Sequence, residues 1–226
     1  MKDKNITEFE NLITRLLKID TISWCKYALK KDLLHKKVEP AFFDEVVKKS
    51  LQCGKNEAMN IAKSLSSHDI YHTAKNLGIY LKIIEQQVGA NYLSFATFTT
   101  PNKIVINCTP IQRAVNLLNS CPTNPLPNLS YDLLLKIIFA HELFHFLESK
   151  NRSTIYTKNV KIVLWQFLWL KCKSNLRVAS EIAAFSFAQE YCELDFSIFV
   201  LDFVLCYSFS SDFAKKIFDN VVKTGD

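Results

Sequence analysis

The chain has 226 residues, of which 49% are apolar and 22% are charged. This balance excludes a disordered protein, and the small numbers of glycine (4) and proline (6) argue against a turn-rich all-β sandwich. The formal net charge of +6 is mild. Part of it comes from the lysine-rich segment 26–37, which we interpret as a solvated helix face, so we do not expect direct binding of nucleic acid.

The first part of the chain, from residue 6 to about 62, has the spacing of amphipathic helices, with expected breaks near 38–43 and 52–56. The next helix is expected to end at Gly78 and to lead into a strand. Two β-rich segments that flank a turn at Pro101 complete a small sheet.

A long helix follows, which Ser130 is expected to cap and which ends near Lys150. A helix over 177–195 and an apolar C-terminal helix come after it. The pattern is α+β and helix-dominated, with a small β-sheet ahead of the long helix. We divide the chain into a helical N-terminal extension, residues 1–62, and a second domain, residues 63–226.

The seven cysteines are scattered and never spaced as Cys-x-x-Cys. This usage is typical of a reduced cytosolic protein and argues against a disulfide framework and against a thiolate zinc site. The N-terminus lacks the apolar stretch of a signal peptide, and the most apolar segments, 161–172 and 196–211, are too short to span a bilayer. We therefore expect a cytoplasmic protein without a membrane partner, in which both segments form buried helices.

The long helix carries the motif His-Glu-x-x-His at residues 141–145. Residues four apart lie on one face of a helix, so His141 and His145 can bind the same cation. Glu142 lies about 100° round the helix axis from His141, where it can reach a water on the metal without binding the metal itself. This arrangement is typical of zinc hydrolases, in which zinc acidifies the water and the glutamate accepts its proton.

An alternative interpretation treats both histidines as core residues bonded to the backbone, and Glu142 as a surface charge. However, the helix is apolar on nearly every face from Leu133 to Leu147, which predicts burial on all sides. Three polar groups in such a helix without a common partner would each cost on the order of a few kcal/mol. One metal ion would satisfy two of them together, so we predict a Zn²⁺ site.

A catalytic zinc usually takes three protein ligands. The third histidine of a metzincin is excluded, because Glu148 and Asn151 stand where that motif needs glycine and histidine. Glu181 is the best candidate, because it opens an alanine-rich helix that could pack closely on the histidine helix. Three acidic residues further along are rivals, and any of the four could instead be a solvated surface charge: Glu190, Glu193 and Asp195.

A second histidine pair, His68 and His72, has aspartate in place of the motif's glutamate and lies on a partly polar helix. We interpret these as surface histidines. Three residues could stabilise an oxyanion, and the sequence does not choose among them: Arg152, Tyr156 and Arg177.

Four segments, taken in order, carry a resemblance to a known family. They are DIYHTAKNLGIYL (69–81), KIVINCTP (103–110), KIIFAHELFHFL (136–147) and EIAAFSFAQEYC (181–192). In this order they resemble the ImmA/IrrE family of zinc metallopeptidases, over about residues 64–195.

The resemblance implies a minimal zincin-like domain of the gluzincin type. In it His141, His145 and Glu181 would be the zinc ligands and Glu142 the catalytic base. It also implies a zinc-dependent endopeptidase whose protein substrate is a helix-turn-helix repressor or an antitoxin-like partner. The alternative function is a non-catalytic, metal-stabilised binding module that sequesters such a regulatory partner.

The chain departs from the family pattern at three places. Phe144 replaces the usual glycine inside the motif, which is expected to narrow the substrate cleft or to change the packing above the zinc. Ala183 and Phe185 stand where the family often has glutamate and asparagine. The connection 150–178 is long and carries two tryptophans, so we expect a remodelled substrate side. None of these changes removes a predicted ligand or the base.

Overall fold

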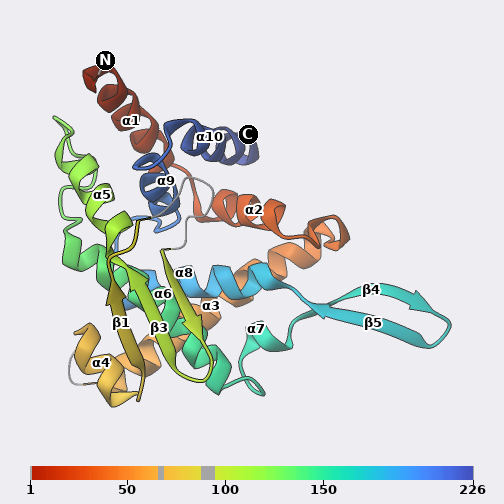
Figure 1. Ribbon diagram of the computed structural model, residues 1–226. Coiled ribbons are helices and arrows are strands. Elements are labelled where there is room, and N and C mark those ends of the chain that lie inside the picture. Colours follow the sequence, from red (N-terminus) through yellow and green to blue (C-terminus); the bar gives the residue numbers. More distant parts are fainter. Residues whose placement is uncertain (1, 66–68, 88–94, 226) are drawn as a thin grey trace.

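The computed structural model describes residues 2–65, 69–87 and 95–225 (Figure 1). The fold is α+β and helix-dominated, as predicted. The helices are α1 (Lys2–Leu16), α2 (Thr21–Lys31), α3 (Pro40–Ser64), α4 (Ile70–Asn76), α5 (Cys108–Asn119), α6 (Tyr131–Lys150), α7 (Tyr156–Asn159), α8 (Arg177–Tyr191), α9 (Val200–Tyr207) and α10 (Ser211–Gly225), with a 3₁₀ turn η1 (His35–Lys37). The strands are β1 (Tyr80–Ile84), β2 (Ala96–Thr99), β3 (Lys103–Asn107), β4 (Lys161–Phe167) and β5 (Leu170–Asn175).

The small sheet has the order β1-β3-β2, with β1 parallel and β2 antiparallel to the central strand β3. Gly78 ends α4 with φ +65° and turns the chain into β1, which confirms the predicted helix end. One face of the sheet packs on α6, where the rings of Phe98 and Phe146 meet edge to face at 6.0 Å. The sheet therefore holds one side of the helix that carries the motif.

Helix α6 begins and ends as predicted. The Ser130 hydroxyl accepts a hydrogen bond from the Leu133 amide at 3.1 Å, and Asp132 lies in the first turn, where a negative charge favours the helix dipole. The helix lies between the sheet on one side and α8 on the other. Both faces of the helix are therefore buried, which explains why its surface is apolar nearly all round.

Helix α3 runs without interruption through residues 52–56, so the predicted break there is wrong. Gly54 marks a close helix contact rather than a helix end, because its backbone lies against α8. A Cβ at position 54 would lie 2.8 Å from the Phe187 amide nitrogen and would overlap the Ala183 carbonyl oxygen. The missing side chain lets α3 and α8 pack along their length, and this contact is the most extensive between helices in the fold.

The helices at the two ends of the chain pack together (Figure 1). Phe9 of α1 stacks on Phe203 of α9 at 5.9 Å, and Trp24 of α2 stacks on Phe199 at 6.0 Å. The apolar segment 196–211 contains the buried helix α9, as expected. Residues on both sides of the predicted domain boundary belong to one hydrophobic core, and the boundary itself stays a prediction. Among the described residues, no helix is long and apolar enough to cross a bilayer.

The other apolar segment, 161–172, was expected to form a buried helix, and that expectation is wrong. It forms the antiparallel hairpin β4–β5, which projects away from the body of the molecule (Figure 1). Periodicity alone cannot separate a short apolar strand from a buried helix. The run is rich in β-branched and aromatic residues, which favour strands and could have suggested the hairpin.

Candidate metal centre

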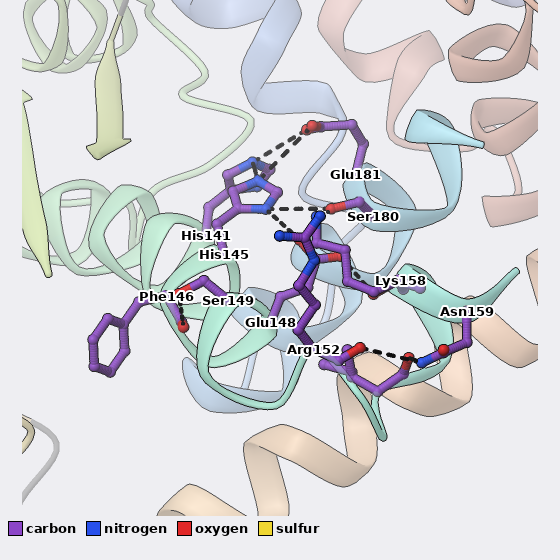
Figure 2. Close-up of polar contacts among 12 residues, drawn as sticks. His141, His145, Phe146, Glu148, Ser149, Arg152, Lys158, Asn159, Ser180 and Glu181 are labelled. Carbon is purple, nitrogen blue, oxygen red and sulfur yellow. Dashed lines mark hydrogen bonds and ion pairs between the residues drawn. The ribbon is translucent and has the colours of Figure 1, made fainter. Parts of the chain in front are cut away.

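His141 and His145 lie one turn apart on α6 and point toward Glu181 on α8 (Figure 2). The two Nε2 atoms lie 3.3 Å apart. The Glu181 carboxylate oxygens lie 3.4 Å from His141 Nε2 and 3.8 Å from His145 Nε2. In the described part of the chain, this is the group whose ligand atoms come together closely enough, within 4.8 Å of one another, to hold one metal ion.

These distances fit a metal ion. Nitrogen and oxygen ligands bind zinc at about 2.0–2.2 Å, so ligands at two corners of a tetrahedron stand about 3.3–3.6 Å apart. The distance between the two histidine nitrogens lies in that range. The two nitrogen–oxygen distances, which involve different oxygens of the Glu181 carboxylate, lie in it or slightly above it. Two imidazoles and one carboxylate are also a ligand set found in catalytic zinc sites. The group could therefore bind a metal ion.

The position of Glu181 depends on how α8 begins. The carboxylate of Asp32, from the segment after α2, accepts a hydrogen bond from the Val178 amide at 3.0 Å. It thereby caps the first turn of α8 from a distant part of the chain, where an anion is favourable. The small, buried Ala183 and Ala184 follow at the helix contact. The N-terminal segment thus helps to fix the helix that carries the third ligand.

The charges at the group favour an ionised carboxylate. Burial raises the pKa of Glu181, but the hydrogen bond and charge of His141 and the charge of His145 outweigh burial and lower that pKa to about 2. Burial lowers the pKa of His141, but Glu181, Glu142 and Asp202 outweigh it, and the pKa is raised. Glu181 is therefore already in the anionic form that a metal ligand needs.

Glu148 supports the second histidine, a role that the sequence reasoning missed. Its carboxylate is buried, with 2% of the side chain exposed, and lies 3.6 Å from His145 Nδ1 (Figure 2). It accepts hydrogen bonds from Ser180 at 2.9 Å and from Thr157, and pairs with Lys158 at 2.7 Å. A carboxylate behind the second nitrogen orients a metal-binding imidazole and fixes its tautomer. The three-residue spacing from His145 is the signal that could have revealed it.

The environment keeps Glu148 ionised. Burial raises its pKa, but the bonds with His145, Lys158, Thr157 and Ser180 outweigh burial and lower the pKa to about 2. A buried carboxylate with this many partners acts as a fixed negative charge behind His145.

Substitution Glu148→Gln is expected to weaken zinc affinity by about 10- to 100-fold while the fold is kept. Glutamine can still accept the bond from Thr157 through its one oxygen, and its NH2 group can donate to the Ser180 hydroxyl, but it removes the charge that polarises His145. Competition with a fluorescent zinc chelator measures the affinity, and Glu190→Gln, on an exposed face of α8, is the matched control. Equal zinc affinity in Glu148→Gln and the wild type would contradict this role.

Two cavities meet at the candidate centre. One, of about 870 Å³, lies between α6, α8, α2 and α9, and the other, of about 940 Å³, lies toward α7. His141, Glu142 and Glu181 line both, so the open space continues past the site on two sides. Glu142 is half-buried, and within the described part of the chain it forms no hydrogen bond or ion pair. Its carboxylate is accessible from the cleft.

Of the other residues predicted for the site, some line the cleft and others lie away from it. Arg152 and Arg177 line the cleft, whereas the Tyr156 ring lies 5.9 Å from the Lys49 ammonium. The rival third ligands are exposed and lie outside the candidate metal group: Glu190, Glu193 and Asp195. The ring of Phe144 is fully buried against Phe187 at 5.8 Å and lines neither cavity, so it changes the core packing rather than the width of the cleft.

The second histidine pair is only partly described. His68 lies outside the described residues. His72 is half-buried on α4, and its Nε2 lies 2.9 Å from the Asn76 amide nitrogen. His72 does not belong to the candidate metal group.

Comparison of the chain with protein-family models, with curated proteins and with solved structures finds no match. Membership of the ImmA/IrrE family therefore stays a prediction.

Proposed function

We propose that the protein is a zinc-dependent endopeptidase of the ImmA/IrrE type. The observation that carries this proposal is the triangle formed by His141, His145 and Glu181, with the carboxylate of Glu142 beside it on an open cleft. Two imidazoles and a carboxylate suit catalytic zinc, and the neighbouring glutamate is the general base that such hydrolases need.

Each residue has a distinct task in this proposal. His141, His145 and Glu181 hold the ion, and Glu148 keeps the ring of His145 in position through Nδ1. When bound, zinc supplies Lewis acidity, which acidifies water and polarises a carbonyl group. The Glu142 carboxylate takes a proton from the attacking water and delivers it to the nitrogen of the leaving amine.

The shape of the cleft supports a polypeptide substrate. Open space on both sides of the site suits a chain that passes through it and is cut in the middle. The cavity between α6, α8, α2 and α9 has the more apolar lining, which includes Ile137, Phe185 and Phe199. This lining suits a large apolar side chain next to the cut bond. By the family resemblance, the substrate is a helix-turn-helix repressor or an antitoxin-like partner.

The alternative function is a metal-stabilised module that binds such a partner without cutting it. Phe144, in place of the glycine usual in the family's motif, would favour this alternative if it obstructed the cleft, but its ring packs in the core away from the cleft. The two functions differ in what becomes of the partner. The endopeptidase cuts it into two fragments, and the binding module leaves it intact.

The test is incubation of the zinc-loaded protein with a helix-turn-helix protein encoded by a neighbouring gene. Intact-mass spectrometry is expected to show two fragments whose masses add up to the partner plus one water. Removal of the metal with a chelator should stop the reaction, and added zinc should restore it. A partner that binds tightly and stays intact with zinc present would favour the binding module instead.

A further inference from the structure

The hairpin β4–β5 exposes an unusual amount of apolar surface. Its tip turns at Leu168, which has φ +52°, and Trp169 beside it is 82% exposed. More than half of the Phe167 side chain is also exposed. The large exposed apolar residues of this hairpin are Val163, Trp165, Phe167, Leu168, Trp169 and Leu170. Contiguous exposed patches of this kind mark interaction sites.

Among the described residues, the main contacts of the hairpin with the rest of the molecule lie near its base. β4 contacts η1 and β5 contacts α7, while the tip extends beyond the body (Figure 1). The exposed tip is convex, so it suits insertion into another phase better than it suits enclosure of a ligand.

Basic residues are concentrated in the same part of the chain. Residues 149–180 contain seven lysines and arginines and no aspartate or glutamate. The remaining residues carry 21 basic and 22 acidic side chains, so this segment accounts for the whole positive charge of the protein. Lys161, Lys171 and Lys173 lie on the hairpin itself and are exposed. In the described part of the chain, no ion pair neutralises these three lysines.

We propose that the hairpin docks on an anionic lipid bilayer. The side chains of Leu168 and Trp169 enter the interface, with Trp165 and Phe167 at the level of the headgroups. Tryptophan favours this position, because its large apolar ring also carries a polar N–H. The lysines behind the tip lie against the negative headgroups, where each contributes about 1 kcal/mol. Docking of this kind needs no spanning helix, and it replaces the expectation, drawn from the sequence, that the protein has no membrane partner.

The hairpin combines a convex apolar tip with side chains that are all positively charged. This combination favours a lipid surface over a protein partner. A protein would need a groove that is both apolar and acidic to match the hairpin, whereas an anionic bilayer offers both properties at every point of its surface. The proposal is independent of the metal site and of the proposed peptidase activity.

The test is flotation of the full-length protein with vesicles of phosphatidylcholine alone or mixed with phosphatidylglycerol. The wild type is expected to float with the mixed vesicles, to float much less with the neutral ones, and to dissociate as salt is added. Its tryptophan emission should shift to the blue, and the shift reports the hairpin, because Trp24 is fully buried and Trp165 and Trp169 are the other tryptophans.

Two double variants separate the apolar and electrostatic contributions. Leu168→Ser with Trp169→Ser is expected to lower vesicle affinity by at least about tenfold, because the inserted apolar area is lost. Lys171→Glu with Lys173→Glu should lower affinity for the anionic vesicles by more than about tenfold. Tyr71→Ser is the matched control, since Tyr71 is 62% exposed on α4, which lies on the other side of the body from the hairpin (Figure 1), and it should bind as the wild type does.

Three outcomes would overturn the proposal. One is a wild type that stays unbound with the anionic vesicles, and another is a Leu168 and Trp169 double variant that binds them as the wild type does. The third is a self-association in light scattering that the same double variant abolishes, which would identify a second copy of the chain as the occupant of the hairpin.

Discussion

Substitution Glu142→Gln is expected to slow cleavage of the protein substrate by about 10²- to 10⁴-fold, which is the contribution of general acid–base catalysis. Glutamine has nearly the same shape as glutamate but cannot take a proton from water. The zinc content should stay at the wild-type value, because Glu142 lies beside the ligand triangle and is not part of it. Cleavage rates from intact-mass spectrometry and zinc from elemental analysis measure the two quantities on the same preparation.

The matched control for this variant is Glu190→Gln, which makes the same chemical change on an exposed face of α8. It should cleave at the wild-type rate. If Glu142→Gln cleaves as fast as the control, Glu142 is not the base and the assignment fails. If neither the wild type nor the variant cleaves a partner that both bind, the binding-module function is supported.

Substitution Gly54→Ala is expected to destabilise the protein by about 3 kcal/mol, at the upper end of the usual cost of overpacking. The new methyl group would overlap the Ala183 carbonyl and lie 2.8 Å from the Phe187 amide nitrogen, and both are backbone atoms of α8. In a solvent-exposed helix the same change would stabilise by about 1 kcal/mol, because alanine is the better helix former. The sign of the change in stability therefore tests the α3–α8 contact. Urea denaturation of the variant and the wild type measures this change.

Substitution Gly78→Ala provides the comparison. Gly78 has φ +65°, and apart from its chain neighbours no atom of the described residues lies within 4 Å of a Cβ built there. Alanine at position 78 should cost about 1–2 kcal/mol through backbone strain alone. A Gly54→Ala variant that is as stable as the wild type, or more stable, would mean that α3 and α8 do not pack as described.

Local signals in the sequence were sufficient to predict the helix that carries the motif. Ser130 caps it and Asp132 follows in its first turn, and both are recognisable from residue type and position. Gly78 likewise ends α4 because only glycine adopts its backbone conformation without strain. The meeting of Glu181 with the histidines was also predictable, because the small residues after it favour close helix packing.

Tertiary contacts decided what the sequence could not predict. Gly54 has the appearance of a helix breaker, and only its contact with α8 explains its position inside α3. The segment around Trp165 and Trp169 is as apolar as a core helix, and its exposure depends on the absence of an element packed over it in the described structure. Glu148 resembles a surface charge at the end of a helix, but partners from α7 and α8 make it a buried support for His145.

The measurement that tests the central claim most directly is the metal content of the purified protein by elemental analysis, with His145→Ala as the control. We expect one zinc per chain in the wild type and none in the variant, while circular dichroism shows that both are folded. A folded wild type that stays free of metal after zinc is offered would contradict the metal centre and the proposed peptidase together.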